Sequence, residues 1–167
     1  GYRALMGEVV ALLEPDIRRH GSDTINAMFD EYFRQFPPHE GRSLLAAMAK
    51  RSFYAREWAL FLNEYSILLC PFMLQPFFAP NRDAEGAEGV IDALGTALWS
   101  YSVNFIGLPA GCVPTHIAAL PQGAQPINVQ LIGQRWREDL LVDAMIAIEA
   151  RLGRPFETLW KHPIASD

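Results

Sequence analysis

The sequence predicts an α/β fold in which a mixed β-sheet is flanked by helices. Helical periodicity dominates residues 1–63, where apolar side chains recur every three or four positions. Short apolar segments of strand length follow at about 66–70, 110–116 and 127–132. Helical patterns separate these segments and follow the last one, which is typical of a sheet covered by helices. We therefore divide the chain into a helical region, residues 1–63, and an α/β region, residues 64–167, which together form one domain or part of one.

The helical region contains three predicted helical segments. Pro15 ends or kinks the first, because proline lacks the amide donor that a helix requires. Ser22 follows a glycine and can cap a second, strongly amphipathic helix that Pro37 and Pro38 end. A longer helix is predicted over about 42–63. Its apolar face and aromatic margin are expected to lie in the core: Leu45, Met48, Ser52, Ala55, Ala59, Leu62, Trp58 and Phe61.

The α/β region opens with an apolar run, residues 66–70, that ends at Pro71 and predicts a fully buried strand. Pro76 and Pro80 then exclude regular structure from the segment that follows. Five large apolar side chains of this segment must either pack inward or line an apolar pocket: Phe72, Met73, Leu74, Phe77 and Phe78. Gln75 and Gln130 are candidates for orienting a polar substrate atom, and ordinary backbone hydrogen bonding is the alternative.

The remaining elements are a polar turn over 81–86, one helical pattern to Tyr101, two strands and a final helix. The strands, about 110–116 and 127–132, suit an antiparallel pair with a long connection. Acidic residues in the first turn and Gly153 at the end mark the last helix, whose buried stripe is expected to be Leu141, Ala144, Met145, Ile148 and Leu152.

Composition excludes several classes of function. The net charge is −5 without a basic stripe, so nucleic-acid binding is not expected. The longest charge-free apolar stretch is broken by prolines and too short to cross a membrane. Two cysteines make no disulfide framework, which fits a cytoplasmic protein. The four histidines are dispersed, so we expect neither a metal site nor a cofactor. Cys112 and His116 are about 13 Å apart along a strand, too far for a nucleophile and its base.

Four motifs, in order, carry a resemblance to a known family. They are Tyr65 through Pro71, then Asn104, Gly107, Pro109, Ala110, Val113 and Pro114, then Pro126 through Gly133, and finally Leu140, Leu141, Ala144 and Glu149. Together, over about residues 60–155, they resemble the C-terminal part of the amidase signature family. Ser66, Phe72 and Asn128 depart from that family's common Asp, Thr and Gly.

The resemblance implies amide-bond hydrolysis or amide-nitrogen transfer by a serine, a second serine on a cis peptide bond, and a lysine. Those residues lie upstream of the matched region in the family, and the only lysines here, Lys50 and Lys161, have no serine pair beside them. We therefore expect the C-terminal portion of an amidase, inactive alone, which supplies sheet, helical cover and a substrate-pocket wall. The motif residues Pro71, Asn104, Gly107, Pro109, Pro114 and Gly133 are expected to be structural.

The resemblance also indicates a partner, a small-molecule amide bound by the parent enzyme. Strand edges and apolar faces left open in the isolated chain further predict a homodimer or larger assembly. Two alternatives remain: a binding or scaffold module derived from an amidase, and the amide-transferring subunit of a tRNA-dependent amidotransferase.

Overall fold

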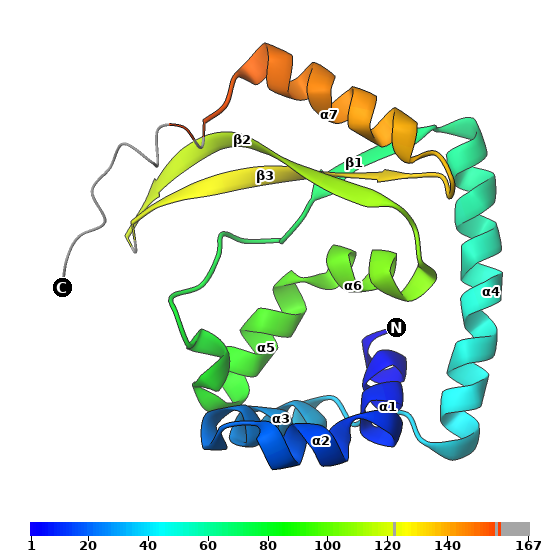
Figure 1. The fold of residues 1–167 in the computed structure, drawn as a ribbon, viewed down its shortest axis with the longest axis vertical. Coiled ribbons are helices and arrows are strands. Elements are labelled where there is room, and N and C mark those ends of the chain that lie inside the picture. Colours follow the sequence, from blue (N-terminus) through cyan, green and yellow to red (C-terminus); the bar gives the residue numbers. More distant parts are fainter. Residues whose placement is uncertain (122, 156, 158–167) are drawn as a thin grey trace. The chain divides into compact units, whose positions relative to one another are not determined.

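The computed structural model describes residues 1–121, 123–155 and 157 of the chain (Figure 1). Helices and strands follow one another in the order α1 (Tyr2–Leu12), α2 (Glu14–His20), α3 (Asp23–Gln35), α4 (Gly41–Glu64), β1 (Ile67–Pro71), a 3-10 helix η1 (Arg82–Ala84), α5 (Gly86–Thr96), α6 (Leu98–Ile106), β2 (Ala110–Leu120), β3 (Gly123–Gly133) and α7 (Glu138–Leu152). The α/β class predicted from the sequence is confirmed.

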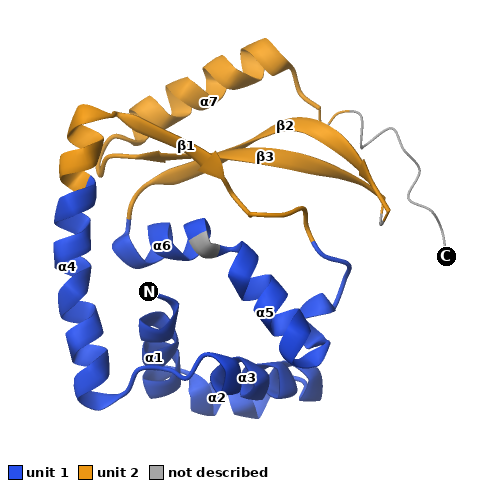
Figure 2. Cartoon of the chain, turned by 180° about the vertical axis from the view of Figure 1, so that it is seen from behind, with its two compact units in different colours: residues 1–58, 78–107 blue, residues 59–77, 108–167 orange. Residues whose placement is uncertain are grey.

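Two compact units make up the chain, and each is built from two separate segments (Figure 2). Residues 1–58 and 78–107 form the first unit, which is helical. Residues 59–77 and 108–167 form the second, which holds the whole described sheet and α7. The division predicted from the sequence, residues 1–63 and 64–167, cuts the chain once, whereas each compact unit contains two segments. That division stays a prediction.

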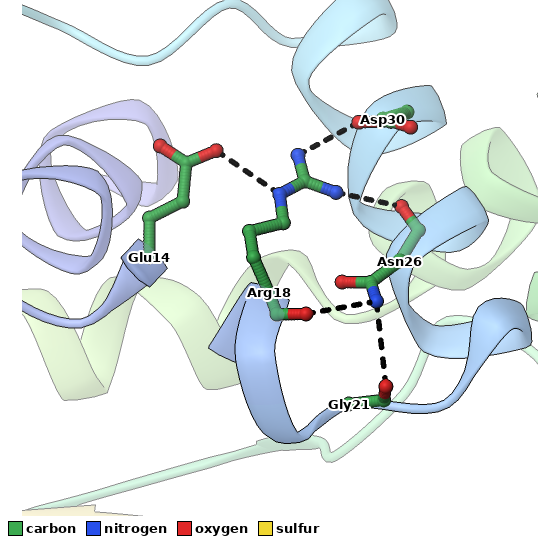
Figure 3. Close-up of polar contacts among 5 residues, drawn as sticks. All are labelled: Glu14, Arg18, Gly21, Asn26 and Asp30. Atoms are coloured by element: carbon green, nitrogen blue, oxygen red, sulfur yellow. Dashed lines mark hydrogen bonds and ion pairs between the residues drawn. The ribbon is translucent and has the colours of Figure 1, made fainter. Parts of the chain in front are cut away.

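Polar contacts join α2 to α3 in the first unit. Ser22 caps α3 by accepting a hydrogen bond from the Ile25 amide at 3.3 Å, as predicted. Arg18 on α2 donates to the Asn26 carbonyl at 3.0 Å and to the Asp30 carboxylate at 2.7 Å (Figure 3). In return, the Asn26 side-chain amide donates to the Arg18 carbonyl at 3.4 Å. These reciprocal contacts fix the α2–α3 turn.

An aromatic cluster around Tyr2 brings α1, α3 and α6 together in the same unit. The Tyr2 ring lies 5.1 Å from that of Tyr101, 6.0 Å from Phe36 and 6.4 Å from Tyr32, centre to centre. Burial disfavours the phenolate and raises the pKa of Tyr2 above its usual range. Burial, with the Asp83 charge as a second cause, raises the pKa of Tyr32 to about 12.

The helical pattern predicted to run to Tyr101 is two helices, because α5 ends at Thr96 and α6 begins at Leu98. The Thr96 hydroxyl donates to the carbonyls of Asp92 and Ala93 within α5, at 2.9 and 3.3 Å. Such bonding of a threonine back to the preceding turn bends helices, and here it coincides with the break.

The sheet of the second unit has the order β1-β3-β2, with antiparallel pairing throughout the described strands. No parallel pair occurs in this part of the chain, so the mixed sheet is corrected to an antiparallel one. Helix α7 packs on β2 and β3, where Val113, Leu131 and Leu141 form a buried cluster. Gly133 faces this helix so closely that an added Cβ would meet the Leu141 side chain at 3.0 Å.

The strand after Tyr65 is an edge strand and is not fully buried. Among the described strands it pairs with β3 alone, and Leu69 on it is 57% exposed. A continuous apolar run does not reveal whether a strand has one neighbour or two, which explains the error.

The predicted long connection between the last two strands is also wrong. Both strands extend further than expected, until Leu120 pairs with Gly123. Gly123 has φ 116°, a conformation that glycine adopts readily and that permits the tight reversal.

Helix α4 has nearly the predicted bounds, but its apolar face is not core. Within residues 41–64, all of which the structure describes, Leu62 alone is buried, while Leu45 is 72% exposed and Phe61 is 40% exposed. The 3.6-residue period identifies the helix, whereas burial needs an opposing surface that a period cannot supply. On α7 the expected stripe is buried or partly buried except for Leu152, which is 54% exposed.

Candidate functional site

A pocket opens in the second unit where β1 ends. The β1–β3 ladder stops at the pair Pro71–Val129, so earlier residues of β3 have no β1 partner. The segment after Pro71 lies beside this uncovered part of β3 and forms with it an open pocket of about 210 Å³. Its walls are Phe72, Met73, Leu74, Gln75, Pro76, Phe77, Pro126, Ile127 and Asn128.

The lining is apolar apart from two carboxamides, Gln75 and Asn128. A dry cavity of about 150 Å³ lined by apolar side chains accommodates benzene, so this pocket has room for an aromatic group. None of the lining side chains titrates, so this wall can bind and orient a ligand but supplies no acid, base or nucleophile.

Most of the predicted substrate-pocket residues lie together. Phe72, Met73, Leu74, Gln75 and Phe77 line the pocket. Phe78 belongs to the first unit and is not in the lining, and neither is Gln130. A role for any of them in substrate binding stays a prediction.

The sequence reasoning did not assign Pro126, Ile127 and Asn128 to this pocket, which they complete from β3. The signal that would have found them is the register of β1 on β3. Because Pro71 pairs with Val129, residues just before Val129 must lie beside the segment that follows Pro71. That register was not predicted.

Gln130 lies between the two cysteines on the sheet. It is 4% exposed, pairs with Cys70 on β1 and with Cys112 on β2, and accepts a hydrogen bond from the Cys70 thiol at 3.5 Å. Burial raises the pKa of both thiols, which keeps them protonated and weakly nucleophilic. With β3 between them, their Cα atoms are about 9.5 Å apart, beyond the ~7 Å limit for a disulfide.

Two of the motif residues shape the end of α6 in the first unit. The Asn104 side chain donates to the Ser100 carbonyl at 2.9 Å, within the helix. Gly107 caps the helix in the left-handed conformation, φ 75°, and its amide donates to the Val103 carbonyl at 2.8 Å. A side chain at this position would be strained, so glycine has a structural reason here.

The motif residues of the second unit organise the start and the middle of β2. The Pro109 carbonyl accepts a hydrogen bond from the Gly133 amide at 3.0 Å, which ties the entry of β2 to the end of β3. After Pro114 the register shifts, and the Thr115 hydroxyl donates to the Ile127 carbonyl at 3.0 Å across this bulge. Proline suits a bulge, where the regular ladder is already interrupted.

Metal binding finds no support among residues 1–121, 123–155 and 157, where no three His, Cys, Asp or Glu side chains gather. His116 is exposed, and its Nδ1 lies 3.2 Å from the Thr115 hydroxyl. In the described part of the chain, no helix combines the length and the hydrophobicity that a bilayer crossing requires.

Comparison with known proteins gives a family match over most of the chain. A family model described as Amidase matches residues 8–142. The chain belongs to the amidase family. Two curated relatives are indoleacetamide hydrolases, from Bradyrhizobium japonicum (36% identity) and from Bradyrhizobium diazoefficiens (38% identity), each over 121 residues and 72% of this chain. A third is a subunit of glutamyl-tRNA(Gln) amidotransferase from Parvibaculum lavamentivorans, 31% identical over 63% of this chain.

Two solved structures have a fold similar to that of this chain. The chain resembles 6-aminohexanoate cyclic dimer hydrolase with a TM-score of 0.53, at 24% identity, over 69% of this chain and 26% of that one. The same enzyme with its substrate gives a TM-score of 0.56, at 22% identity, over 77% and 29%. At these identities the likeness concerns the fold alone.

The family match begins at residue 8, so it includes helices that the four motifs, starting near residue 60, did not reveal. Amphipathic helices share few fixed residues, and the motif comparison therefore missed them. The chain spans about a quarter of the length of the curated relatives it matches, 25% and 22% for the two indoleacetamide hydrolases.

Proposed function

We propose that this chain is the C-terminal part of an amide hydrolase that uses Ser-cisSer-Lys chemistry on a small carboxamide. The serines and the lysine of that chemistry lie outside these 167 residues. The part described here supplies sheet, helical cover and one wall of the substrate site. Family membership, together with the apolar pocket after β1, carries this proposal.

The pocket favours an amide whose acyl part ends in an aromatic ring. Its walls present Phe72, Phe77 and Met73, which offer ring faces and a polarizable thioether to a flat apolar group. Two of the relatives are named as hydrolases of indoleacetamide, an amide of this shape. An arylacetamide is therefore the substrate class we propose.

A second candidate is the amide-transferring subunit of a tRNA-dependent amidotransferase, since one relative has a name of that kind. Two observations favour the hydrolase. The identity to the indoleacetamide hydrolases is higher, and the sequence is acidic overall, with a net charge of −5 and no basic stripe of the kind that binds RNA. Copurification with partner subunits would support the transferase.

The test compares two proteins in an ammonia-release assay with indole-3-acetamide and phenylacetamide. One is the 167-residue chain, and the other is the product of the complete gene from which this sequence comes. We expect turnover from the complete product and none from the 167 residues. Turnover by the 167-residue chain would refute the proposal that the catalytic residues lie outside it. An inactive complete product would refute the proposed hydrolase function.

A further inference from the structure

Asn128 is a carboxamide in an apolar wall, at a position where the described part of the chain offers its side chain no hydrogen bond. It pairs across the strands with Pro114, and the neighbour two residues earlier on the same face is Pro126. Proline has neither an amide donor nor a polar side chain. Gln130, two residues later, is already engaged, because it accepts from Cys70.

The backbone of Asn128 is nonetheless part of the sheet. It lies within β3 and pairs with Pro114 of β2, next to the bulge of that strand and just beyond the last β1 pair. The other carboxamide of the pocket, Gln75, is exposed and lies on the irregular segment after β1. A group held by a strand selects a ligand more sharply than one on a loop, because it cannot move to accommodate a poor fit.

We propose that Asn128 determines which aromatic ring the pocket accepts, by receiving a hydrogen bond from an N–H donor on that ring. The inference rests on the proposed function, since it names the kind of arylacetamide that the site prefers. The apolar walls bind the ring, and the Asn128 carbonyl oxygen is the acceptor. A ring without a donor fills the pocket and leaves this oxygen without a partner, and that costs affinity.

Residues after β1 complete the geometry that this selection needs. Phe72 and Phe77 lie in the same wall, while Pro126 and Ile127 lie beside Asn128 on β3. A flat ring that binds with its edge toward β3 would direct its N–H at the Asn128 carbonyl oxygen. Gln75 remains available at the exposed side for the polar group that the ring carries.

The test measures binding of two ligands to the 167-residue chain by NMR chemical-shift titration. Indole-3-acetamide has a ring N–H, and benzofuran-3-acetamide has an oxygen at that position with almost the same shape. We expect the indole to bind about three- to tenfold more tightly, the range of one neutral hydrogen bond. Equal affinities, or no binding of either ring, would overturn the proposal.

Matched variants separate the hydrogen bond from shape. Asn128→Leu removes the acceptor at similar volume and is expected to abolish the preference, whereas Asn128→Asp keeps an acceptor and is expected to retain it. Gln75→Leu is the control: it should weaken the binding of both ligands alike and leave the preference between them intact. A preference that survives in Asn128→Leu would contradict the role of Asn128.

Hydrolysis by the complete gene product distinguishes this inference from the proposed function. If that enzyme hydrolyses both amides with equal kcat/KM, the hydrolase stands and the role of Asn128 fails. If it hydrolyses neither, while the 167-residue chain prefers the indole through Asn128, the hydrolase fails and the ring selection stands.

Discussion

Gly133→Ala is the substitution whose cost the structure defines best. An added Cβ would lie 3.0 Å from Cγ of Leu141, and 3.1 and 3.3 Å from its two methyl carbons. Leu141 is 4% exposed in the cluster under α7, so its branched end has no space to retreat. Overpacking of this kind costs about 1–3 kcal/mol. Reduced entropy of the unfolded chain returns about 0.4–1 kcal/mol, which leaves a net loss of about 1.3 kcal/mol at the middle of both ranges.

Urea denaturation followed by circular dichroism measures this loss. With a slope of about 1–3 kcal/mol per molar, the midpoint should fall by roughly 0.4–1.3 M for Gly133→Ala at unchanged slope. Leu141→Ala alone should cost about 2–5 kcal/mol through the cavity it leaves. The double variant should cost about 1–2 kcal/mol less than the sum of the two, because the new methyl group then fills that cavity.

Gly111→Ala is the matched control on the neighbouring strand. Its Cβ would collide with the Met145 sulfur, but this side chain is unbranched, partly buried and able to take another rotamer. We expect a smaller loss than at Gly133. If Gly133→Ala is as stable as the unsubstituted chain, or if its effect adds to that of Leu141→Ala without coupling, the close packing of α7 on the sheet is refuted.

Three further predictions concern strain, ionisation and assembly. Trp136 is 87% exposed and has the left-handed backbone conformation, φ 66°. Trp136→Asn should raise the melting temperature by relieving roughly 0.5–1 kcal/mol of backbone strain, and a lower or unchanged melting temperature would contradict this. Folding raises the pKa of Tyr2 and Tyr32 above the unfolded value near 10, so their neutral forms stabilise the fold below that pH and the benefit disappears as pH rises toward about 12. Part of the phenolate absorbance should therefore appear only above about pH 10, together with loss of the helical circular dichroism signal. Titration of all tyrosines near pH 10 would argue against the buried cluster. Finally, exposed apolar side chains such as Phe53 (59%) and Leu69 (57%), with the open edge of β1, predict self-association of the 167-residue chain in sedimentation, and a clean monomer without dye-binding surface would refute it.

Local signals predicted much of this fold because they depend on neighbouring residues. Proline and glycine positions located the break before Pro15 and the end of α7, and Ser22 caps α3 as expected. The apolar period predicted α4 almost to the residue. In each case a few adjacent residues contain the whole physical cause.

Strand position and burial were predicted poorly, because they depend on residues that lie far apart in the sequence. Whether β1 is central or peripheral depends on which strands pair with it, and the exposure of Leu45 depends on what lies opposite α4. The candidate pocket divides in the same way. Its loop wall was predicted from five apolar side chains beside prolines, four of which line it, while its strand wall, with Asn128, follows from the register and was missed.

The two ladders of the sheet close very different lengths of chain. Strands β2 and β3 form a hairpin whose last pair joins Leu120 to Gly123, whereas Cys70 of β1 contacts Gln130 across 60 residues of sequence. Closing the longer loop costs more conformational entropy, so we expect the hairpin to form early and β1 to dock late. The pocket wall follows β1 directly, so we expect it to assemble after the hairpin. A ligand that binds this pocket would therefore hold the slowest-forming strand in place, and amide hydrogen exchange should slow in β1 before it slows in the hairpin.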